Sequence, residues 1–578
     1  MIVRSTLAGL ALLLAPFVCA LELRLDPAGL DAPQQERARA LLDATQARLP
    51  LAWQADARVL PLRFDPSLDA AVAGHHWQRR IRLNPTLLAP APAQSADVLP
   101  DRAVASLVHE IAHALDRDGG HWSADPVFRR LAGWDRLGRG NPYRLRSPDD
   151  YERHSAAEAF AVNLEWFLLD PSYACRRPAL AAWYAQQFGW PADMQGASCA
   201  PGLAWLAATG SSGGVAIEQI DPARVYAVDY LLADSGGPPM SRFGHSMLRL
   251  VICAPGRAPG ERCRMDLANH RVLSFRAFVD DVQVSSWAGL TGAYPSRLFL
   301  LPLNQVIDEY NRVELRDLRA WPLDLSQAQV TSLLQSAAQV HWSYDGDYTF
   351  IGNNCAVETG RLLDTALDPA GGRHYRDTFP RGVLRQLVAD GLAPALPAGH
   401  DDPAAGLWFP SARAEYMAVF ARLQQAGQLP AMDLMQWLDA PPARRGALPA
   451  QMSLEQAAAW LVLERAAQRR AELRALASLK PRLPQSPALG GAVAGWLQWL
   501  RRIDAPGRLP LAGYGLPQAA ELEAAQPALQ ALIEQGPGQW QQLQAQAEAA
   551  LDPALQEQLE QGRQRLAQIG AHLRAQLH

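Results

Sequence analysis

The motif His109-Glu110-Ile111-Ala112-His113 constrains the fold of this 578-residue chain more than any other stretch. It lies in a segment with helical apolar periodicity, which we predict to begin after Pro100-Asp101. Histidines four residues apart share one face of a helix, where both imidazoles can bind one zinc ion at about 2.0–2.1 Å. Glu110 then lies beside the open metal position, where a general base is needed. The motif therefore predicts His109 and His113 as zinc ligands and Glu110 as a catalytic residue.

A third ligand is expected from a second predicted helix, because two histidines and one glutamate leave a fourth position for water. Tyr151 is followed seven residues later by a glutamate, within Glu158-Ala159-Phe160-Ala161. Together with H-E-x-x-H-A, this spacing resembles the anthrax lethal factor-like gluzincin metallopeptidases. The resemblance implies a zincin-like domain, Glu158 as the zinc ligand and Tyr151 as a hydroxyl donor to a developing oxyanion. Glu165, one heptad further along the same helix, is the alternative ligand.

A short predicted strand, Trp77-Gln78-Arg79-Arg80-Ile81-Arg82-Leu83, comes before the metal-binding helix. In zinc peptidases of this general plan such a strand edges the cleft and can pair with an extended substrate. The first half of the chain therefore predicts a peptide or protein substrate.

Length and composition indicate a globular protein of about three domains, since 49% of the residues are hydrophobic and 19% charged. We predict an α+β chain with a zincin-like domain at 21–208, a second domain at 214–397 and a helical region at 398–578. The Gly/Ser-rich run after residue 208 is the expected linker. A net charge of -4 gives no reason to expect a nucleic-acid partner.

Residues 1–20 have the features of a cleavable secretory signal, with Arg4 before an apolar run and Val18-Cys19-Ala20 as the cleavage site. No later stretch reaches about 18 uninterrupted apolar residues, so we expect no transmembrane segment in the mature chain. These features predict a periplasmic protein.

In that oxidising compartment cysteines should pair. Of the six cysteines, five follow the predicted cleavage site. We predict that Cys253 pairs with Cys263 across a Pro/Gly-rich hairpin and that Cys175 pairs with Cys199. Cys355 is left unpaired.

Cys355 follows Asn353-Asn354 in the predicted first turn of a helix, and His245 begins a predicted strand. A helix N-terminus and a nearby imidazole both lower the pKa of a thiol, so the two residues could form a nucleophile and base. The alternative is a buried structural cysteine and an unrelated strand histidine. For a third group that orients His245 we favour His270, with Asn269 or Ser274 as alternatives.

The same region carries a series of short motifs: Leu290-Thr291-Gly292-Ala293-Tyr294-Pro295, Glu309-Tyr310-Asn311, Arg316-Asp317-Leu318, Trp321-Pro322-Leu323 and Asn354-Cys355. They resemble the Lnb N-terminal periplasmic domain. The order of histidine before cysteine also resembles circularly permuted NlpC-like and lecithin:retinol acyltransferase-like enzymes. That likeness implies a permuted papain-like fold in which Cys355 and His245 act on an amide or ester through an acyl-enzyme.

Taken together, these features predict an exported hydrolase with a zinc peptidase site and a Cys/His amidase or acyl-transfer site. Peptides, proteins or acylated lipids of the cell envelope would be its substrates. The alternative is a non-catalytic periplasmic binding or maturation factor with a structural zinc. Structural zinc sites usually have four protein ligands, and the sequence offers three good ones, which favours catalysis.

Overall fold

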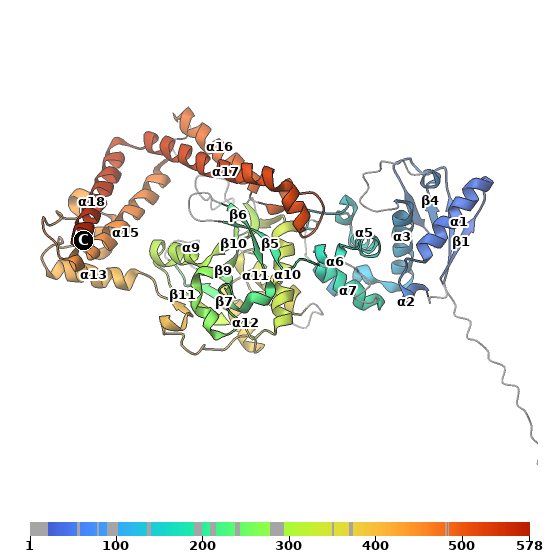
Figure 1. Ribbon diagram of the computed structural model, residues 1–578, viewed down its shortest axis with the longest axis horizontal. Helices are drawn as coiled ribbons and strands as arrows, with labels where there is room; N and C mark the ends of the chain where they lie inside the picture. Colours follow the sequence, from blue (N-terminus) through green and yellow to red (C-terminus); the bar gives the residue numbers. More distant parts are fainter. Residues whose placement is uncertain are drawn as a thin grey trace, which may run out of the picture. The chain divides into compact units, whose positions relative to one another are not determined.

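The computed structural model describes residues 21–54, 58–77, 80–89, 102–135, 140–189, 199–208, 215–236, 243–277, 294–349, 352–368, 374–479, 483, 485–503 and 505–577. The predicted signal at residues 1–20 lies outside the described residues. The chain divides into two compact units (Figure 1). The first contains Met1–Ala132, Asp149–Ala174 and Leu180–Ser198, and the second contains the rest. Both units combine helices with strands, so the α+β class is confirmed.

The first unit is built on a four-stranded sheet in the order β1-β2-β4-β3. Its strands are β1 (Glu22–Asp26), β2 (Val59–Phe64), β3 (Gly74–Trp77) and β4 (Arg80–Leu83). The pairs β1–β2 and β2–β4 are parallel, whereas β3 is antiparallel to β4 at the edge. The helices up to residue 188 are α1 (Ala32–Gln46), α2 (Leu51–Gln54), α3 (Arg102–Leu115), α4 (Pro126–Leu131), α5 (Ala156–Leu169), α6 (Tyr173–Arg176) and α7 (Pro178–Phe188).

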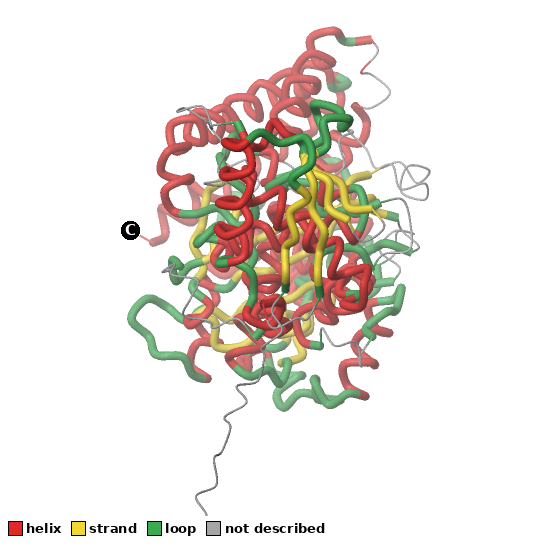
Figure 2. The backbone as a smooth tube through the Cα atoms, turned by 90° about the vertical axis from the view of Figure 1, so that its right-hand side faces the viewer, coloured by secondary structure: helices red, strands yellow, loops and turns green. Residues whose placement is uncertain are grey.

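Alternation along the strands gives this sheet one buried and one exposed face. Leu60, Leu62 and Ile81 are buried under α1 and α3, which contact the strands and each other. Figure 2 colours all strands of the chain yellow and all helices red. The predicted apolar stripe of α3 is fully buried, as expected for a helix that packs on a sheet: Val104, Leu107, Val108, Ile111 and Leu115.

The second unit holds a nine-stranded sheet with the order β13-β11-β7-β8-β9-β10-β5-β6, in which β12 also pairs with β10. Its strands are β5 (Leu203–Ala208), β6 (Val215–Ile220), β7 (Val225–Ala233), β8 (His245–Ile252), β9 (Arg271–Ala277), β10 (Tyr294–Pro302), β11 (Leu318–Pro322), β12 (Gly346–Tyr348) and β13 (Trp408–Phe409).

Strand β5 marks a difference from the predicted domain boundary at residue 208. It is antiparallel to β6 and parallel to β10, so it belongs to the sheet of the second unit. Residues 133–148 and 175–179 also belong to that unit. Strand pairing at long sequence separation decides these memberships, and local composition does not encode it.

Helices cover both faces of the nine-stranded sheet. One face packs against α10 (Gln327–Ser343) and α11 (Cys355–Leu367), and the other against α9 (Leu303–Ile307) and the π-helical turn at Asp308–Val313. The remaining helices are α12 (Pro380–Ala389), α13 (Arg413–Gln425), α14 (Leu434–Asp439), α15 (Leu454–Leu479), α16 (Pro487–Ile503), α17 (Ala519–Ala550) and α18 (Pro553–Leu577).

The C-terminal region is helical, as predicted, but it is not a separate compact unit. Trp499 of α16 and Leu529 of α17 are buried in the same core as the residues of α10 and α11. Within the described parts of the chain, every helix is too short or too polar to cross a membrane.

Both predicted disulfides are present. Cys175 pairs with Cys199, and Cys253 pairs with Cys263. Cys355 is unpaired and buried.

His341, near the end of α10, ties two strands of the second unit together. Its Nε2 accepts a hydrogen bond from the backbone N–H of Leu206 in β5 at 3.0 Å. Because Nε2 accepts, Nδ1 carries the proton and donates to the carbonyl of Leu298 in β10 at 2.8 Å. Burial lowers the pKa of His341 to about 4, although the Leu298 carbonyl opposes this shift. The folded protein therefore holds His341 neutral.

We expect the second unit to lose stability as pH falls from about 6.5 to about 4, since the unfolded chain binds a proton at His341 that the folded chain does not. In H341Q the slope of unfolding free energy against pH should decrease by up to about 1.4 kcal/mol per pH unit in this window. Urea unfolding at several pH values measures the slope. H374Q, at a half-exposed histidine, is the control, and an unchanged slope in H341Q would contradict the assignment.

Candidate functional site

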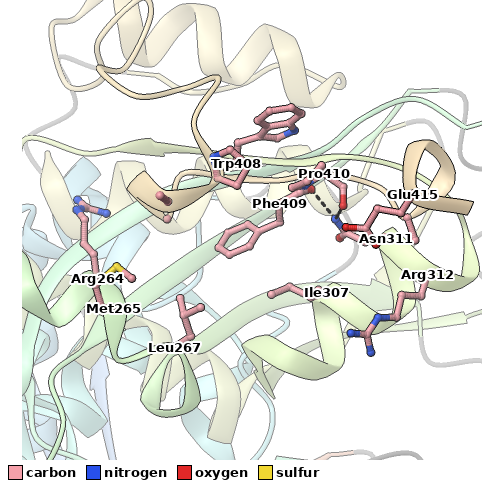
Figure 3. A pocket seen from close by; sticks show the side chains of 14 residues that line it. Arg264, Met265, Leu267, Ile307, Asn311, Arg312, Trp408, Phe409, Pro410 and Glu415 are labelled. Atoms are coloured by element: carbon pink, nitrogen blue, oxygen red, sulfur yellow. Dashed lines mark hydrogen bonds between the residues drawn. The ribbon is translucent and has the colours of Figure 1, made fainter. Parts of the chain in front are cut away.

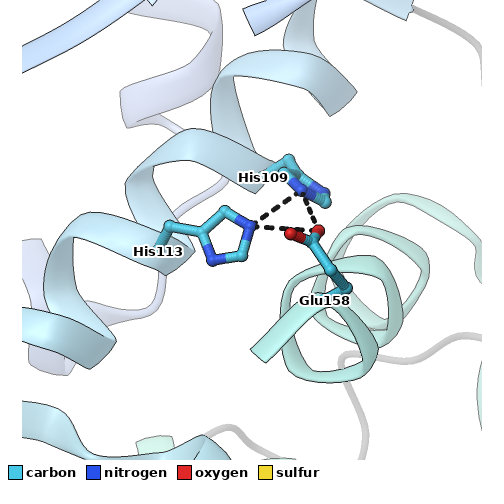
Figure 4. Close-up of side chains that lie close together, drawn as sticks. All are labelled: His109, His113 and Glu158. Carbon is cyan, nitrogen blue, oxygen red and sulfur yellow. Dashed lines mark hydrogen bonds and ion pairs between the residues drawn. The ribbon is translucent and has the colours of Figure 1, made fainter. Parts of the chain in front are cut away.

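Three of the predicted ligands converge between α3 and α5. Nε2 of His109 lies 3.0 Å from Nε2 of His113. Oε2 of Glu158 lies 3.1 Å from the first of these nitrogens and 3.2 Å from the second. Figure 4 shows the three side chains pointing to a common centre. The described residues contain one such cluster of three donors that could hold a metal ion.

The spacing of these donors fits a tetrahedral metal ion. Ligands at about 2.0–2.1 Å from a tetrahedral zinc lie about 3.3 Å apart, close to the three separations observed. Two imidazole nitrogens and one carboxylate oxygen are also a donor set that zinc prefers. The residues therefore fit a zinc ion held by His109, His113 and Glu158.

Local sequence explains why the donors meet. His109 and His113 are one helical turn apart on the face of α3 that turns away from its buried stripe. Glu158 lies in the first turn of α5, where the Ser155 hydroxyl caps the helix by accepting the Glu158 backbone N–H at 3.1 Å. Helix α5 packs along α3, so its first turn faces both histidines.

Glu165 lies behind the cluster and does not join it. Its Oε1 is 2.5 Å from Nδ1 of His109, the ring nitrogen that faces away from the three-donor centre. This contact fixes the ring orientation and the tautomer of His109, which is the usual role of a carboxylate behind a metal-binding histidine. The structure therefore assigns Glu165 an orienting position and leaves Glu158 as the candidate ligand.

The charges around His109 favour a cation. Burial lowers the pKa of His109, but hydrogen bonds with Glu158 and Glu165 outweigh burial and raise it to about 10. For Glu158 burial acts in the other direction and raises the pKa. Hydrogen bonds with both histidines outweigh it and bring the pKa of Glu158 below its usual range. Two carboxylates thus stabilise positive charge at this position, whether it is a proton or a metal ion.

Glu110 is buried on the same helix, with 6% of its surface exposed. Burial raises the pKa of Glu110 to about 7, against a lowering by the charge of His109. Its side chain packs closely against the edge strand β3. A Cβ atom added at Gly74 would lie only 2.8 Å from both Cγ and Oε1 of Glu110. Sequence reasoning did not identify Gly74, and the local sequence gives no signal for this close approach.

Tyr151 lies in the 3₁₀ turn Asp150–Arg153 that leads into α5. Its side chain is 54% exposed, and its ring packs against His154 with centroids 5.3 Å apart. Among the residues that the structure describes, the Tyr151 hydroxyl has no hydrogen-bond partner. The structure places this residue on the approach to α5, and its oxyanion role stays a prediction.

The structure does not bring Cys355 and His245 together. Cys355 is the first residue of α11 and lies beside Ser246 and Tyr348. His245 precedes Ser246 on β8, and successive residues of a strand point to opposite faces of the sheet. The His245 ring accordingly stacks on Tyr310 at 6.0 Å, in the core on the other face. The predicted dyad is therefore corrected: the two side chains occupy opposite sides of the sheet.

The predicted third group is also corrected. Nε2 of the fully buried His270 bonds to the carbonyl of Cys263 at 2.8 Å. The partner of His245 is Ser274, one of the two alternatives to His270, whose hydroxyl lies 2.9 Å from Nε2. The burial of His245, together with the charges of Arg276 and Arg316, lowers its pKa to about 3. A histidine so hard to protonate is a poor general base.

Burial also decides the state of Cys355. It raises the pKa of this thiol above its ordinary value, although the Ser246 and Tyr348 groups and the Ala356 backbone each oppose the shift. The position at the start of a helix was expected to lower the pKa, but burial is the stronger effect here.

Two pockets of the second unit lie away from the predicted residues. One has a volume of about 260 Å³, and its lining includes Ile307, Phe409, Arg264 and Glu415 (Figure 3). The other, of about 720 Å³, lies among α15 to α18 and contains Trp540. Neither pocket is lined by a predicted catalytic or metal-binding residue.

The fold and the site define a mixed α and β protein that carries a three-donor cluster suited to a metal ion. Residues 215–389 match the family model of the Lnb N-terminal periplasmic domain, and residues 120–196 match a domain of unknown function (DUF7844). The second match includes Glu158 and Glu165 but begins after His113. No curated protein and no solved structure matches the chain. The match to a periplasmic domain and the two disulfides are consistent with an exported protein.

We expect E165Q to weaken zinc binding by about 10–100-fold, because His109 loses the group that orients it. E158Q should weaken it more, since a ligand is removed. Competition with a chromophoric chelator measures both affinities, and E36Q on the exposed side of α1 is the control. If E165Q were as damaging as E158Q, Glu165 would be a direct ligand.

Alkylation of Cys355 by iodoacetamide at pH 8 should be slow in the folded protein and fast in urea. Burial raises the pKa of the thiol, so little of the reactive thiolate forms in the folded protein. H245A should label at the wild-type rate, since the histidine lies on the other face of the sheet. Mass mapping of the labelled peptide gives the rate. Fast labelling that H245A slows would restore the dyad.

Proposed function

We propose that this chain is an exported zinc-dependent peptidase that acts on peptides or proteins of the cell envelope. The observation that carries the proposal is the convergence of His109, His113 and Glu158 at tetrahedral spacing. Glu110 lies buried on the same helix beside a sheet edge. Three donors rather than four are typical of a catalytic zinc site.

A zinc ion bound there would supply Lewis-acid chemistry to a water molecule and to the substrate carbonyl. The other tasks belong to the chain. Glu165 holds the His109 ring in place through Nδ1. Glu110 accepts the proton of the attacking water at a carboxylate oxygen and passes it to the leaving amine, as a general base and then a general acid.

Strand β3 supports an extended peptide as the substrate. It is the last strand of its sheet, and within the described ranges its outer edge pairs with no other strand. The N–H and C=O groups along such an edge can pair with an added strand. The His76 backbone N–H is the exception, since it donates to the Glu110 side chain. Gly74 brings this strand against the Glu110 side chain, so a peptide paired there would pass the proposed general base.

Tyr151 keeps its proposed role in this mechanism. An exposed phenol just before the helix that carries Glu158 can donate a hydrogen bond to the substrate carbonyl oxygen as negative charge develops. The thiol chemistry is not included, because Cys355 and His245 lie on opposite faces of their sheet.

The rival function is a non-catalytic periplasmic factor in which zinc only stabilises the fold. In this rival function the same three residues bind zinc, but Glu110 has no role, although its carboxyl group is buried and is not a ligand. A substitution at this residue therefore separates the two functions.

We expect E110Q to bind one zinc ion per chain, as the wild-type protein does, and to lose at least 100-fold in peptide cleavage. Metal analysis and a peptide library digested by the zinc-loaded full chain provide the two measurements. E36Q is the matched control for loss of a carboxylate. Zinc binding without cleavage of any peptide by the wild-type protein would favour the rival.

A further inference from the structure

The exposed face of the edge strand carries aromatic side chains. Gly74 and His76 turn inward toward α3, so His75 and Trp77 lie on the solvent face. Trp77 is 56% exposed, and its ring is stacked with that of His75 at a centroid distance of 6.2 Å and an interplanar angle of 14°. A tryptophan so exposed on a sheet edge contributes little to the core.

Arginines lie next to these rings. In the register of β3 and β4, His75 is opposite Arg82 and Trp77 is opposite Arg80. An Nη atom of Arg82 is 3.4 Å from Nδ1 of His75. Arg80 is exposed and has no ion-pair partner among the described residues.

The positive charge extends to the next strand. Arg63 is in register with Arg82, and both side chains share one carboxylate, that of Asp65, at 2.7 and 3.2 Å. Asp26 of β1 is exposed and in register with Arg63, so it lies on the same face. Three arginines against two aspartates still leave this part of the face positively charged. This positively charged area begins at the outer edge of β3, the same strand that lies against the Glu110 side chain.

We infer that this face selects substrates, and that the peptides it favours carry acidic side chains. A peptide strand paired with β3 places every second side chain on the same face as His75 and Trp77. Carboxylates at those positions can form ion pairs with Arg80 and Arg82, and aromatic side chains can stack on Trp77. The inference rests on the proposed function, because it takes the peptide to lie along β3.

A simpler role for the same residues is protection of the sheet edge, since charged side chains prevent pairing with other chains. Protection of the edge needs charged side chains but not a particular sign of charge. Residues with that role alone would not distinguish acidic from basic peptides. Discrimination by charge is therefore the property to test.

The test compares two fluorescent decapeptides, one alternating Glu with Val and the other alternating Lys with Val. Their binding to the zinc-loaded full chain is followed by fluorescence anisotropy in the E110Q background, which prevents cleavage. We expect the acidic peptide to bind at least tenfold more tightly. Adding R80E should abolish or reverse this preference, and adding W77A should weaken both peptides. R39E, on the exposed side of α1, is the control with the same change of net charge.

Equal binding of the two peptides, or a preference that R80E and R39E change equally, would overturn the inference. If the wild-type protein cleaved acidic and basic peptides equally well, the inference would be wrong and the proposed peptidase function would still hold. Preferential binding that R80E removes, in a chain that cleaves no peptide, would support the recognition face while the proposed peptidase fails.

Discussion

The packing of α5 along α3 is the contact on which the candidate site depends. Helix α3 buries an apolar stripe, and α5 is buried on most of its surface. Where the two helices meet, α3 presents histidines and α5 presents glutamates. Removing those groups from water is costly, and the cost is offset only because every charge meets a partner. His109 is held by carboxylates at both ring nitrogens, and Glu158 contacts both histidines. A cation at the centre would complete this balance, which is why the fold of the first unit and the chemistry of its site cannot be separated.

The parts of this site that could be predicted from sequence are those set by helical periodicity. His109 and His113 share a face because they are four residues apart. Tyr151 and Glu158 come from the resemblance to the lethal factor-like peptidases, and Tyr151 lies in the 3₁₀ turn before α5. The two disulfides were predictable for a different reason: cysteines of an exported chain should pair, and each pair closes a local loop. The approach of Gly74 to Glu110 was not predictable, because it depends on how an edge strand crosses a helix more than thirty residues away.

The second unit shows where sequence reasoning fails. A strand and a helix start were both identified correctly at His245 and Cys355, yet the conclusion that they meet was wrong. Side chains alternate along β8, so Ser246 lies on the face covered by α11 and His245 on the other face. A shift of the strand by one residue would exchange the faces of these two side chains. Sequence alone does not reveal which face a helix far along the chain will cover. The placement of β5 in this sheet has the same origin, since its partner β10 is distant in sequence.

The two glutamates of α5 show how position within one helix separates two roles. Both are available to His109, since they are seven residues apart and lie on one face. Glu158 is in the first turn, where the partial positive charge of the helix N-terminus favours an ionised carboxylate, and its side chain is 28% exposed. Glu165 is two turns further in, only 13% exposed, and burial raises its pKa despite the contact with His109. The first is therefore suited to bind a cation directly, and the second to share a proton with the imidazole that it orients.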